Sequence, residues 1–351
     1  MEKVYDLHIH YTFELSLQDT VEIFQEEFTA TGTEKYCFLS LPHHVVDGKA
    51  ELDKTQNVKG LYLKSKFQPN AYAFAGLVHP DEHCDQERIA EAFLAQVEEY
   101  LSVGYDGVKM LEGYPSLLKA WKLPLDSPIY DKFYRFMEEN GYPILMHIAN
   151  PQENWDVEQA SLQAIEAGRV YDASYPSKAE ITAQVFRVME RFPKLKLILA
   201  HFGFMSYDIQ EAARFMSYPN TLFDVTPGGE QLIRMQKEWV EWQPFWEKHQ
   251  ERILYGTDFY AFPKDENWET AFHRRPKMLR QFFETETEHV YLDESFMGVG
   301  LSHSLRNKIY RENFTKLLGE PKPIDEGYLL REAERVLKAD DLQYVQQTLH
   351  K

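Results

Sequence analysis

Short runs rich in apolar, β-branched and aromatic residues recur along the chain, and each has the length of a buried strand. The runs predict eight strands, which cover Val4–His10, Lys35–Leu41, Ala71–His79, Gly107–Leu111, Pro143–His147, Leu195–His201, Thr221–Thr226 and Ile253–Asp258. Their carboxyl ends mostly lie roughly 25 to 40 residues apart, which is the length of a strand followed by a helix. The pattern therefore predicts a series of βα units.

Stretches with helical spacing fill most of the intervals between these runs. Predicted helices cover Arg88–Val103, Tyr130–Glu139, Ile181–Arg191, Leu305–Leu318 and Tyr328–Lys338. Alternating strands and helices favour a parallel sheet, and the lack of a glycine-rich fingerprint after the first strand favours a closed barrel over a doubly wound sheet. We therefore expect an α/β protein with one domain, residues 1–351, folded as a single (β/α)8 TIM barrel with a C-terminal helical extension at about 303–351.

Two intervals are longer than a βα connection requires. Asn150–Ser177 separates the fifth and sixth strands and has room for an extra helix around Asp156–Ala167, so we expect a lid there. Trp155 lies in this segment and either covers the substrate or packs within the loop. The second long interval runs from Phe259 to about Lys277, after the eighth strand.

Charge and cysteine content narrow the functional class. The chain carries 38 Lys and Arg against 56 Asp and Glu, a net charge of −18, which is unlike a protein that binds nucleic acid or anionic lipid. No apolar run approaches the ~20 residues of a membrane helix, the first residues enter a strand pattern directly, and two cysteines make no disulfide framework. We expect a soluble cytoplasmic protein whose partner is a small-molecule substrate, with a homo-oligomer left open.

Histidines gather at one end of the predicted strands. Of the 13 in the chain, seven lie at or just past a carboxyl end: His8, His10, His43, His44, His79, His147 and His201. In a barrel these ends meet at the face that holds the active site. The distribution therefore indicates one shared site.

Four predicted strands end in side chains that can bind a metal ion. The first ends in His8-Ile9-His10, and alternate residues of a strand share a face, so both imidazoles can reach one ion. The fifth, sixth and eighth end in His147, His201 and Asp258 after strongly apolar runs. Each could singly be a satisfied core residue, but burying all four is costly unless they share a cation. Imidazole and carboxylate ligands suit zinc, and also iron, manganese or cobalt.

The ordered set of motifs resembles the amidohydrolase superfamily of metal-dependent (β/α)8 barrels. More narrowly, it is similar to the branch that contains aminocarboxymuconate-semialdehyde decarboxylase, related aromatic-acid decarboxylases and dicarboxylate lactonases. The supporting segments are Tyr5–His10, Gly107-Val108-Lys109, Ala200–Gly203, Tyr255–Asp258 and the late helix Ile309–Gly319. The resemblance spans nearly the whole chain.

The resemblance implies roles for these residues. His8, His10, His147 and Asp258 would hold one divalent metal, with zinc favoured, and His201 would polarise a substrate carbonyl or hold the attacking water. A divalent metal lowers the pKa of bound water towards ~7. Asp258 is then placed to take a proton from that water and deliver it to the leaving group.

Lys109, on the fourth strand, has two interpretations. In some superfamily members a lysine here is carboxylated and bridges two metals, whereas in the branch that this sequence resembles it often lacks that role. A buried lysine near a cation needs a carboxylate partner or must lose its charge, and Glu112 could pair with it only across a turn. We favour a single metal ion, with Lys109 near the metal or the substrate.

Other residues are candidates for substrate binding, each with a plainer alternative. His44 and His79 follow the second and third strands and either line the pocket or lie solvated in loops. Arg274 and Arg275 follow the eighth strand and either bind a substrate carboxylate or form a surface pair.

Three functions are consistent with the motifs. The favoured one is a metal-dependent hydrolase of a small, carboxylate-bearing amide, lactone or ester. A non-oxidative decarboxylase, which is a lyase, would use the same metal cage, so the motifs do not separate these two reactions. A catalytically inactive binding barrel is disfavoured because the set of ligands is complete.

Overall fold

The computed structural model describes residues 1–349 except 13, 47–48, 81–84, 228–230 and 264–270. Its main sheet has nine strands in the order β10-β9-β8-β7-β6-β5-β2-β1-β11, and all neighbouring strands run parallel. These strands are β1 (Val4–Tyr11), β2 (Thr33–Leu39), β5 (Ala71–Gly76), β6 (Gly107–Gly113), β7 (Pro143–Ile148), β8 (Lys196–Leu199), β9 (Thr221–Asp224), β10 (Ile253–Leu254) and β11 (Phe259–Ala261). The predicted parallel α/β architecture is confirmed.

The two outermost strands of this sheet are successive pieces of one segment. β10 pairs with β9, whereas β11 pairs with β1 at the other end of the strand order. The backbone N–H of Leu7 also donates to Tyr255 O at 3.1 Å. The sheet therefore curls until its two ends meet in this segment. The expectation of one strand over Ile253–Asp258 is wrong, because Asp258 has a left-handed backbone with φ +52°, which interrupts a strand.

Strands from the two ends of the sheet contribute side chains to one hydrophobic cluster on the inner side of the curled sheet. It contains Leu7, Leu39, Phe74, Leu145, Ile198, Leu222, Leu254 and Phe314, all buried. Phe314 comes from a late helix and packs edge-on against Tyr5 and Tyr72, with ring centroids 5.7 and 5.0 Å away. Alternate strand residues point inwards, so the same strands that bury this cluster can also direct polar side chains to its rim.

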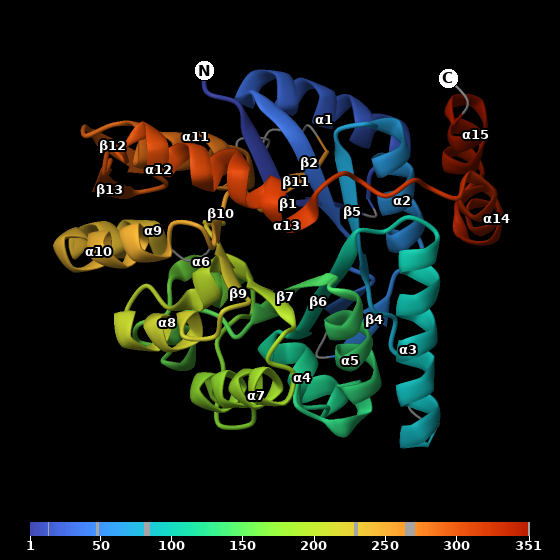
Figure 1. Cartoon of the computed structure of the whole chain (residues 1–351), viewed down its shortest axis with the longest axis horizontal. Coiled ribbons are helices and arrows are strands. Elements are labelled where there is room, and N and C mark those ends of the chain that lie inside the picture. Colours follow the sequence, from blue (N-terminus) through green and yellow to red (C-terminus); the bar gives the residue numbers. More distant parts are fainter. Residues whose placement is uncertain (13, 47–48, 81–84, 228–230, 264–270, 350–351) are drawn as a thin grey trace.

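Helices surround the sheet, with α1 at the top of Figure 1, α3 at the right, α7 at the bottom and α10 at the left. They are α1 (Leu17–Thr31), α2 (Gln56–Lys66), α3 (Gln86–Ser102), α4 (Pro115–Trp121), α5 (Asp131–Asn140), α7 (Lys178–Arg191), α8 (Ile209–Met216), α9 (Gln231–Lys237), α10 (Trp239–His249) and α11 (Ala271–Glu284). Local signals define their ends. Ser177 and Glu180, for instance, form a reciprocal capping box at the start of α7.

Further helices follow along the chain after α11. They are α12 (His303–Asn307), α13 (Asn313–Leu318), α14 (Glu326–Val336) and α15 (Ala339–Thr348), with a π-helical turn at Lys308–Glu312 between α12 and α13. Buried Asp341 of α15 accepts a hydrogen bond from Leu17 N at 2.7 Å and lies 3.3 Å from Lys59 Nζ. These contacts join α15 to α1 and α2.

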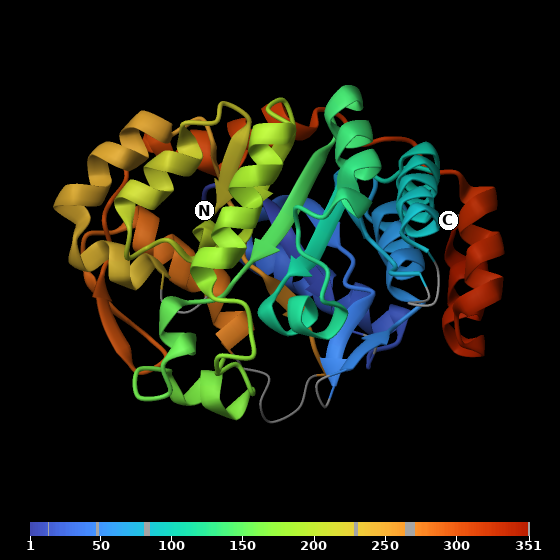
Figure 2. The same cartoon turned by 90° about the horizontal axis from the view of Figure 1, so that it is seen from below.

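Two excursions lie at the carboxyl ends of the strands. One is the predicted lid, which contains the 3-10 turn Gln152–Trp155 and a short α6 (Leu162–Glu166), so the helix expected around Asp156–Ala167 is shorter than predicted. The other is a hairpin of β3 (His43–Val46) and β4 (Lys49–Leu52). In Figure 2 the green lid and the blue hairpin project from the same side of the molecule.

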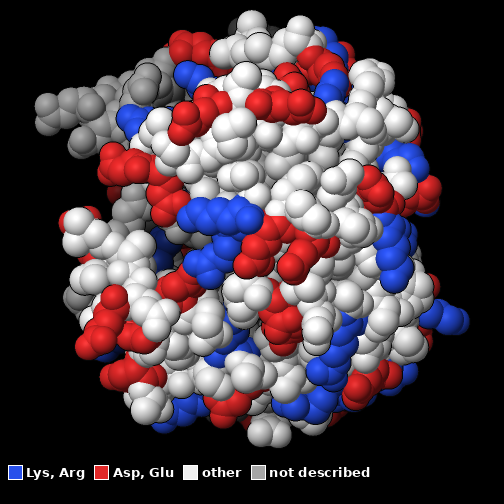
Figure 3. All heavy atoms as spheres, turned by 90° about the vertical axis from the view of Figure 1, so that its left-hand side faces the viewer, with Lys and Arg blue, Asp and Glu red and all other residues white. Residues whose placement is uncertain are grey.

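A second hairpin, β12 (Glu288–Tyr291) and β13 (Glu294–Met297), precedes α12. Figure 3 shows basic side chains interspersed with acidic ones on the face that lies at the left of Figure 1, rather than gathered in one basic patch. Within the described ranges, no helix is both long and apolar enough to cross a membrane.

Candidate metal centre

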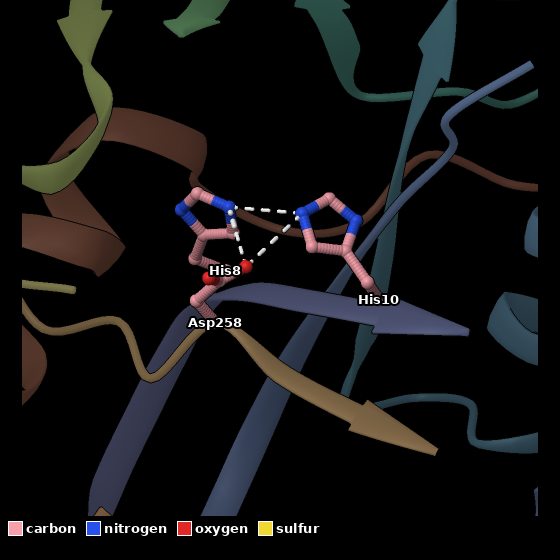
Figure 4. Close-up of side chains that lie close together, drawn as sticks. All are labelled: His8, His10 and Asp258. Atoms are coloured by element: carbon pink, nitrogen blue, oxygen red, sulfur yellow. Dashed lines mark hydrogen bonds and ion pairs between the residues drawn. The ribbon is translucent and has the colours of Figure 1, made fainter. Parts of the chain in front are cut away.

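Three potential metal ligands converge where β1 meets the segment between β10 and β11 (Figure 4). The Nε2 atoms of His8 and His10 lie 3.0 Å apart, and Asp258 Oδ1 lies 3.5 and 3.4 Å from them. All three residues are buried, and their ligand atoms lie within 4.8 Å of one another. The two histidines are separated by one strand residue, which is why both rings point to the same place.

The hydrogen bonds of the two histidines leave their Nε2 atoms without protons. His10 Nδ1 lies 2.9 Å from Leu39 O, which can only accept, so this nitrogen carries the proton. His8 Nδ1 donates to the Asp224 carboxylate at 2.8 Å. Two lone pairs therefore face each other across 3.0 Å beside a carboxylate oxygen. A divalent cation would stabilise this arrangement, and the pairing of a ligand histidine with a second carboxylate is usual at metal sites.

The surroundings keep both imidazoles neutral. Burial lowers the pKa of His8 and of His10 well below the usual value for histidine. The positive charge of Lys109 lowers the pKa of both further. Only a neutral imidazole can ligate a metal, so the two rings are ready to do so at neutral pH.

Asp224, at the end of β9, supports both His8 and His201. Its Oδ2 accepts from His8 Nδ1, while its Oδ1 accepts from the backbone N–H of His201 at 2.7 Å and from Thr226 Oγ1 at 2.6 Å. It is fully buried. One carboxylate therefore sets the position of two histidines from different strands.

Asp6 supports the backbone on either side of the ligand cluster. It accepts from His8 N at 3.0 Å and from Thr257 Oγ1 at 2.6 Å. Burial raises the pKa of Asp6 to about 7, although these hydrogen bonds oppose the rise. The contacts tie β1 to the residue that precedes Asp258.

Asp258 is held from three directions. Its backbone N–H donates to His8 O at 2.8 Å, and Arg275 of α11 donates to its carbonyl oxygen at 2.9 Å and to its Oδ2. Oδ1 is therefore the oxygen that faces the two histidines. Burial raises the pKa of Asp258 despite the opposing charges of Arg275 and Lys109.

Lys109 on β6 reaches the same cluster, with its Nζ 3.4 Å from His8 Nε2. Burial lowers the pKa of Lys109 to about 8, against the charges of Asp224 and Asp258. Glu112 turns away and lies 3.3 Å from His79 Nε2. The carboxylates that offset the charge of Lys109 are therefore chiefly those of the metal centre.

His201 lies on an unusual turn rather than on a strand. β8 ends at Leu199, and residues His201, Phe202, Gly203 and Phe204 follow with φ of 55°, 53°, 59° and 52°. A left-handed backbone costs roughly 1–2 kcal/mol for each residue other than glycine, so other contacts must hold the turn. Besides Asp224, the buried Lys178 of α7 holds it by donating to Phe204 O.

The hydrogen bonds of His201 determine its protonation. Thr226 Oγ1 gives its proton to Asp224, so it can only accept from His201 Nδ1, 3.0 Å away. Burial lowers the pKa of His201 well below its usual value, so the ring is neutral. The proton is therefore on Nδ1, and Nε2 can accept a hydrogen bond but cannot donate one. This state suits the holding of a water rather than the polarisation of a carbonyl.

His147, at the end of β7, lies beside this cluster without entering it. Its ring centroid is 5.1 Å from that of His201. Its Nε2 donates to Ala149 O at 3.0 Å, and burial lowers its pKa to about 3. Among the described residues, the group of ligand atoms within 4.8 Å contains His8, His10 and Asp258 and omits His147. The ring proton of His147 is therefore on Nε2, and Nδ1 is the nitrogen that carries the lone pair.

All five of these site residues line one cavity of about 930 Å³, beneath the lid. The five are His8, His10, His147, His201 and Asp258. Aromatic residues, among them Tyr114, Phe204, Tyr260 and Phe262, form part of its wall. The lid contributes Asn150, Asn154 and Arg169. The cavity therefore joins the metal centre to a chamber that can hold a small organic molecule.

Some of the residues predicted to bind substrate line the cavity in the structure, and others do not. His44 does line the cavity, and its Nε2 lies 3.7 Å from Glu51 Oε2. His79 instead stacks on Trp121 with a centroid distance of 3.6 Å. Among the described lining residues, His44 is present and His79 is absent.

Trp155 and Arg274 also lie outside the described lining. Trp155 donates to Pro176 O at 3.1 Å, so it fastens the two ends of the lid together. Arg274 is exposed on α11, whereas its neighbour Arg275 reaches the cavity and binds Asp258. Of the two arginines, the structure brings Arg275 rather than Arg274 into the site.

Sequence reasoning missed two residues that matter to this geometry. Asp224 lies inside the predicted strand Thr221–Thr226, so a search for carboxylates within the strands, and not only at their ends, would have found it. Arg169 carries no such signal, because it lies in the lid beyond the helix expected around Asp156–Ala167 and at no strand end.

Comparison with known proteins gives a family for the chain. The profile of the family described as amidohydrolase matches residues 62–319, so the His8-Ile9-His10 motif lies before the match. No curated protein sequence matches the chain.

Solved structures share the fold at low sequence identity. An uncharacterised TIM-barrel protein from Bordetella bronchiseptica aligns with a TM-score of 0.55 and 16% identity over 90% of this chain and 98% of that one. A 4-oxalomesaconate hydratase from Rhodopseudomonas palustris aligns with 0.52 and 14% over 97% and 99%. A dihydroxybenzoic acid decarboxylase from Polaromonas, solved with bound manganese and an inhibitor, aligns with 0.50 and 15% over 91% and 97%.

The match to the amidohydrolase family covers most of the chain, and the similar structures have the same parallel α/β architecture over nearly its full length. The resemblance inferred from the strand-end motifs is confirmed: the chain belongs to the amidohydrolase family.

Proposed function

We propose that this protein is a metal-dependent hydrolase of a small, carboxylate-bearing amide, lactone or ester, built on a single (β/α)8 barrel domain with a C-terminal helical extension. The observation that carries the proposal is the convergence of His8 Nε2, His10 Nε2 and Asp258 Oδ1 in a buried cluster that opens into a cavity. Membership of the amidohydrolase family supports it. The charge and cysteine content fit a cytoplasmic enzyme, whose oligomeric state we leave open.

One divalent metal would be held by His8, His10 and Asp258, with His147 as a fourth ligand. Zinc suits two imidazoles and a carboxylate, as do manganese, iron and cobalt. Manganese is the ion in the similar decarboxylase structure. The Lys109 ammonium, 3.4 Å from His8 Nε2, favours one metal over two, because a bridging lysine would have to be carboxylated.

Different side chains of the protein have different roles in the proposed hydrolysis. A bound divalent metal supplies an acidified water and polarises the substrate carbonyl. His201 Nε2, a hydrogen-bond acceptor, orients the attacking water. Asp258 takes the proton of that water and delivers it to the leaving group as the amine or alcohol departs. Arg275 donates to Asp258 Oδ2 and so fixes the orientation of the carboxylate, with Oδ1 towards the two histidines.

Decarboxylation is the second candidate, because burial raises the pKa of Asp258. A carboxyl group that keeps its proton more readily can deliver it to the carbanion left by departing carbon dioxide. The similarity to a dihydroxybenzoic acid decarboxylase supports the same possibility at the level of the fold.

One experiment separates the two reactions. The protein is purified without chelator, its metal is measured by elemental analysis, and a panel of lactones, amides, esters and aromatic acids is incubated with it in water enriched in oxygen-18. Hydrolysis incorporates the label into product, whereas decarboxylation releases carbon dioxide without label in the organic product. Metal-free protein that turns over substrate at the full rate would overturn both proposals.

A further inference from the structure

The cavity above the metal centre has four cationic side chains among its described lining residues, and three of them are already engaged. Each of the three contacts a partner that holds its charge in place. The engaged cations are Lys109 on His8, Arg275 on Asp258, and Lys119 on Ser174 and the Tyr175 ring. The fourth is Arg169 of the lid.

Among the residues that the structure describes, Arg169 has no such partner. Within the described ranges, no hydrogen bond or ion pair joins its guanidinium to another side chain, even though Glu166 lines the same cavity three residues earlier. An arginine presents five N–H donors in a planar fork and cannot lose its charge. A free guanidinium that lines a cavity is therefore a ready receptor for an oxyanion.

The backbone around Arg169 fixes its position. Gly168 adopts φ +64°, which reverses the chain after α6 and favours glycine at that position. The N–H of Arg169 then donates to Ala164 O at 2.8 Å. Two residues later, the N–H of Tyr171 donates to Asn154 O at 2.7 Å. The segment is thus tied to the rest of the lid on both sides of Arg169.

The charge of Arg169 acts on groups at the metal end of the cavity. Burial lowers the pKa of His147, and the positive charges of Lys109 and then Arg169 lower it further. Burial raises the pKa of Tyr260, and Arg169 is among the charges that oppose the rise. His147 and Tyr260 belong to β7 and β11, so the charge of Arg169 acts on the part of the cavity wall that these strands form.

We propose that Arg169 is a recognition site for a carboxylate of the substrate that is remote from the group reacting at the metal centre. This inference rests on the proposed function and makes it more specific. A hydrolase substrate would be an amide, lactone or ester with a separate carboxylate. A decarboxylase substrate would carry a second acidic group in addition to the carboxylate that is lost. A bidentate contact with a planar carboxylate would fix the orientation of the substrate relative to Asp258.

Calorimetric binding of simple acids tests the proposal without turnover. The probes are succinate, glutarate, isophthalate and terephthalate, each compared with its neutral diamide, on protein with and without added zinc. We expect at least one diacid to bind wild-type protein and Arg169→Gln to weaken that binding about tenfold or more, as for loss of a charge-assisted bidentate contact. Arg169→Lys should restore part of the affinity, because it keeps the charge but loses the fork.

The control is Arg331→Gln, which removes the charge of an exposed arginine on α14, far from the described lining of the cavity. It should leave diacid binding within about twofold of wild type. Diacid binding that Arg169→Gln does not weaken, or binding no stronger than that of the diamides, would overturn the assignment.

The two proposals fail in different ways. Arg169-dependent binding that persists without zinc supports the subsite even if the panel of reactions shows no hydrolysis. Zinc binding and turnover that do not depend on Arg169 would support the proposed metal centre and contradict the proposed carboxylate site at Arg169.

Discussion

His8 Nδ1 lies 2.8 Å from Oδ2 of Asp224, and this contact joins β1 to β9 across the inside of the curled sheet. The other oxygen of the same carboxylate receives the backbone N–H of His201. A single buried group therefore orients a proposed metal ligand and the residue proposed to hold the attacking water.

Replacing Asp224 should weaken metal binding without removing any ligand. We expect Asp224→Asn to lower zinc affinity about 10- to 100-fold, because the amide leaves the His8 ring without its anionic partner. Competition with a chromophoric chelator measures the dissociation constant. Asp172→Asn, an exposed change in the lid, is the control and should leave the constant unaltered. An Asp224→Asn protein that binds zinc like wild type would show that the contact is not needed.

The place of His147 in the metal site can be measured directly. We expect His10→Ala to abolish stoichiometric zinc binding, because His10 Nε2 belongs to the convergent cluster. His147→Ala should lower zinc affinity at least about tenfold, since it removes the proposed fourth ligand. His303→Ala, an exposed change on α12, provides the baseline. Unchanged affinity in His147→Ala would limit the protein ligands to three.

Asp258 should separate metal binding from chemistry. We expect Asp258→Asn to keep part of the bound metal, because two imidazoles remain, while kcat falls about 10²- to 10⁴-fold through loss of proton transfer. Metal content and steady-state kinetics on the same preparation measure both effects. Near-normal kcat in this variant would remove Asp258 from the proton-transfer role.

Lys178 should stabilise the left-handed turn that carries His201. We expect Lys178→Met to speed amide hydrogen exchange in residues 200–206 and to lower kcat, with KM and metal content nearly unchanged. The reason is that Phe204 O loses its donor while the ligands stay in place. Lys194→Met, an exposed change beyond α7, controls for loss of a positive charge. Exchange rates equal to those of wild type would mean that the other contacts hold the turn alone.

The buried, neutral His147 should contribute a loss of stability to the metal-free protein as the pH falls below about 6.5. Burial lowers the pKa of His147 to about 3 in the folded state, whereas an unfolded chain binds this proton near pH 6.5. Between these values the unfolded state holds more protons, so the free energy of unfolding decreases as the pH falls, by up to about 1.4 kcal/mol per pH unit for each such group. The pKa values of His8, His10 and His201 are lowered in the same sense.

Urea unfolding between pH 7 and 4 tests this dependence. His147→Gln should show a shallower slope than wild type, because the substituted side chain does not titrate. Equal slopes in the two proteins would contradict the neutral, buried state of His147.

The fold was predictable because a sheet covered on both faces needs continuous apolar runs, which are visible in the sequence. The runs located seven strands well, although β5 ends at Gly76 and β8 at Leu199, before the histidines expected at their ends. The prediction of the eighth strand was wrong because the pattern of apolar residues does not indicate a positive φ at Asp258. The hairpin that includes His43 and the last helix, α15, were also missed, because their pairing depends on tertiary contacts.

The part of the candidate site that lies at the carboxyl ends of strands could be predicted from the sequence. His8, His10 and Asp258 converge because parallel strands bring their carboxyl ends together. The choice between Arg274 and Arg275 required the rotational phase of α11, which single-residue motifs do not contain. That Arg169 lines the cavity and pairs with no carboxylate of the described residues follows from three-dimensional packing, which the sequence does not show.

Phe314 fills the far end of the curled sheet, where it packs against Tyr5 and Tyr72. The reaction chamber is therefore closed at this end, and its entrance lies beneath α6 and the β3–β4 hairpin. In the part of the chain that the structure describes, this packing closes one end of the chamber, so product leaves by the route through which substrate enters. Product should consequently compete with reactant for the free enzyme, and turnover should slow as it accumulates.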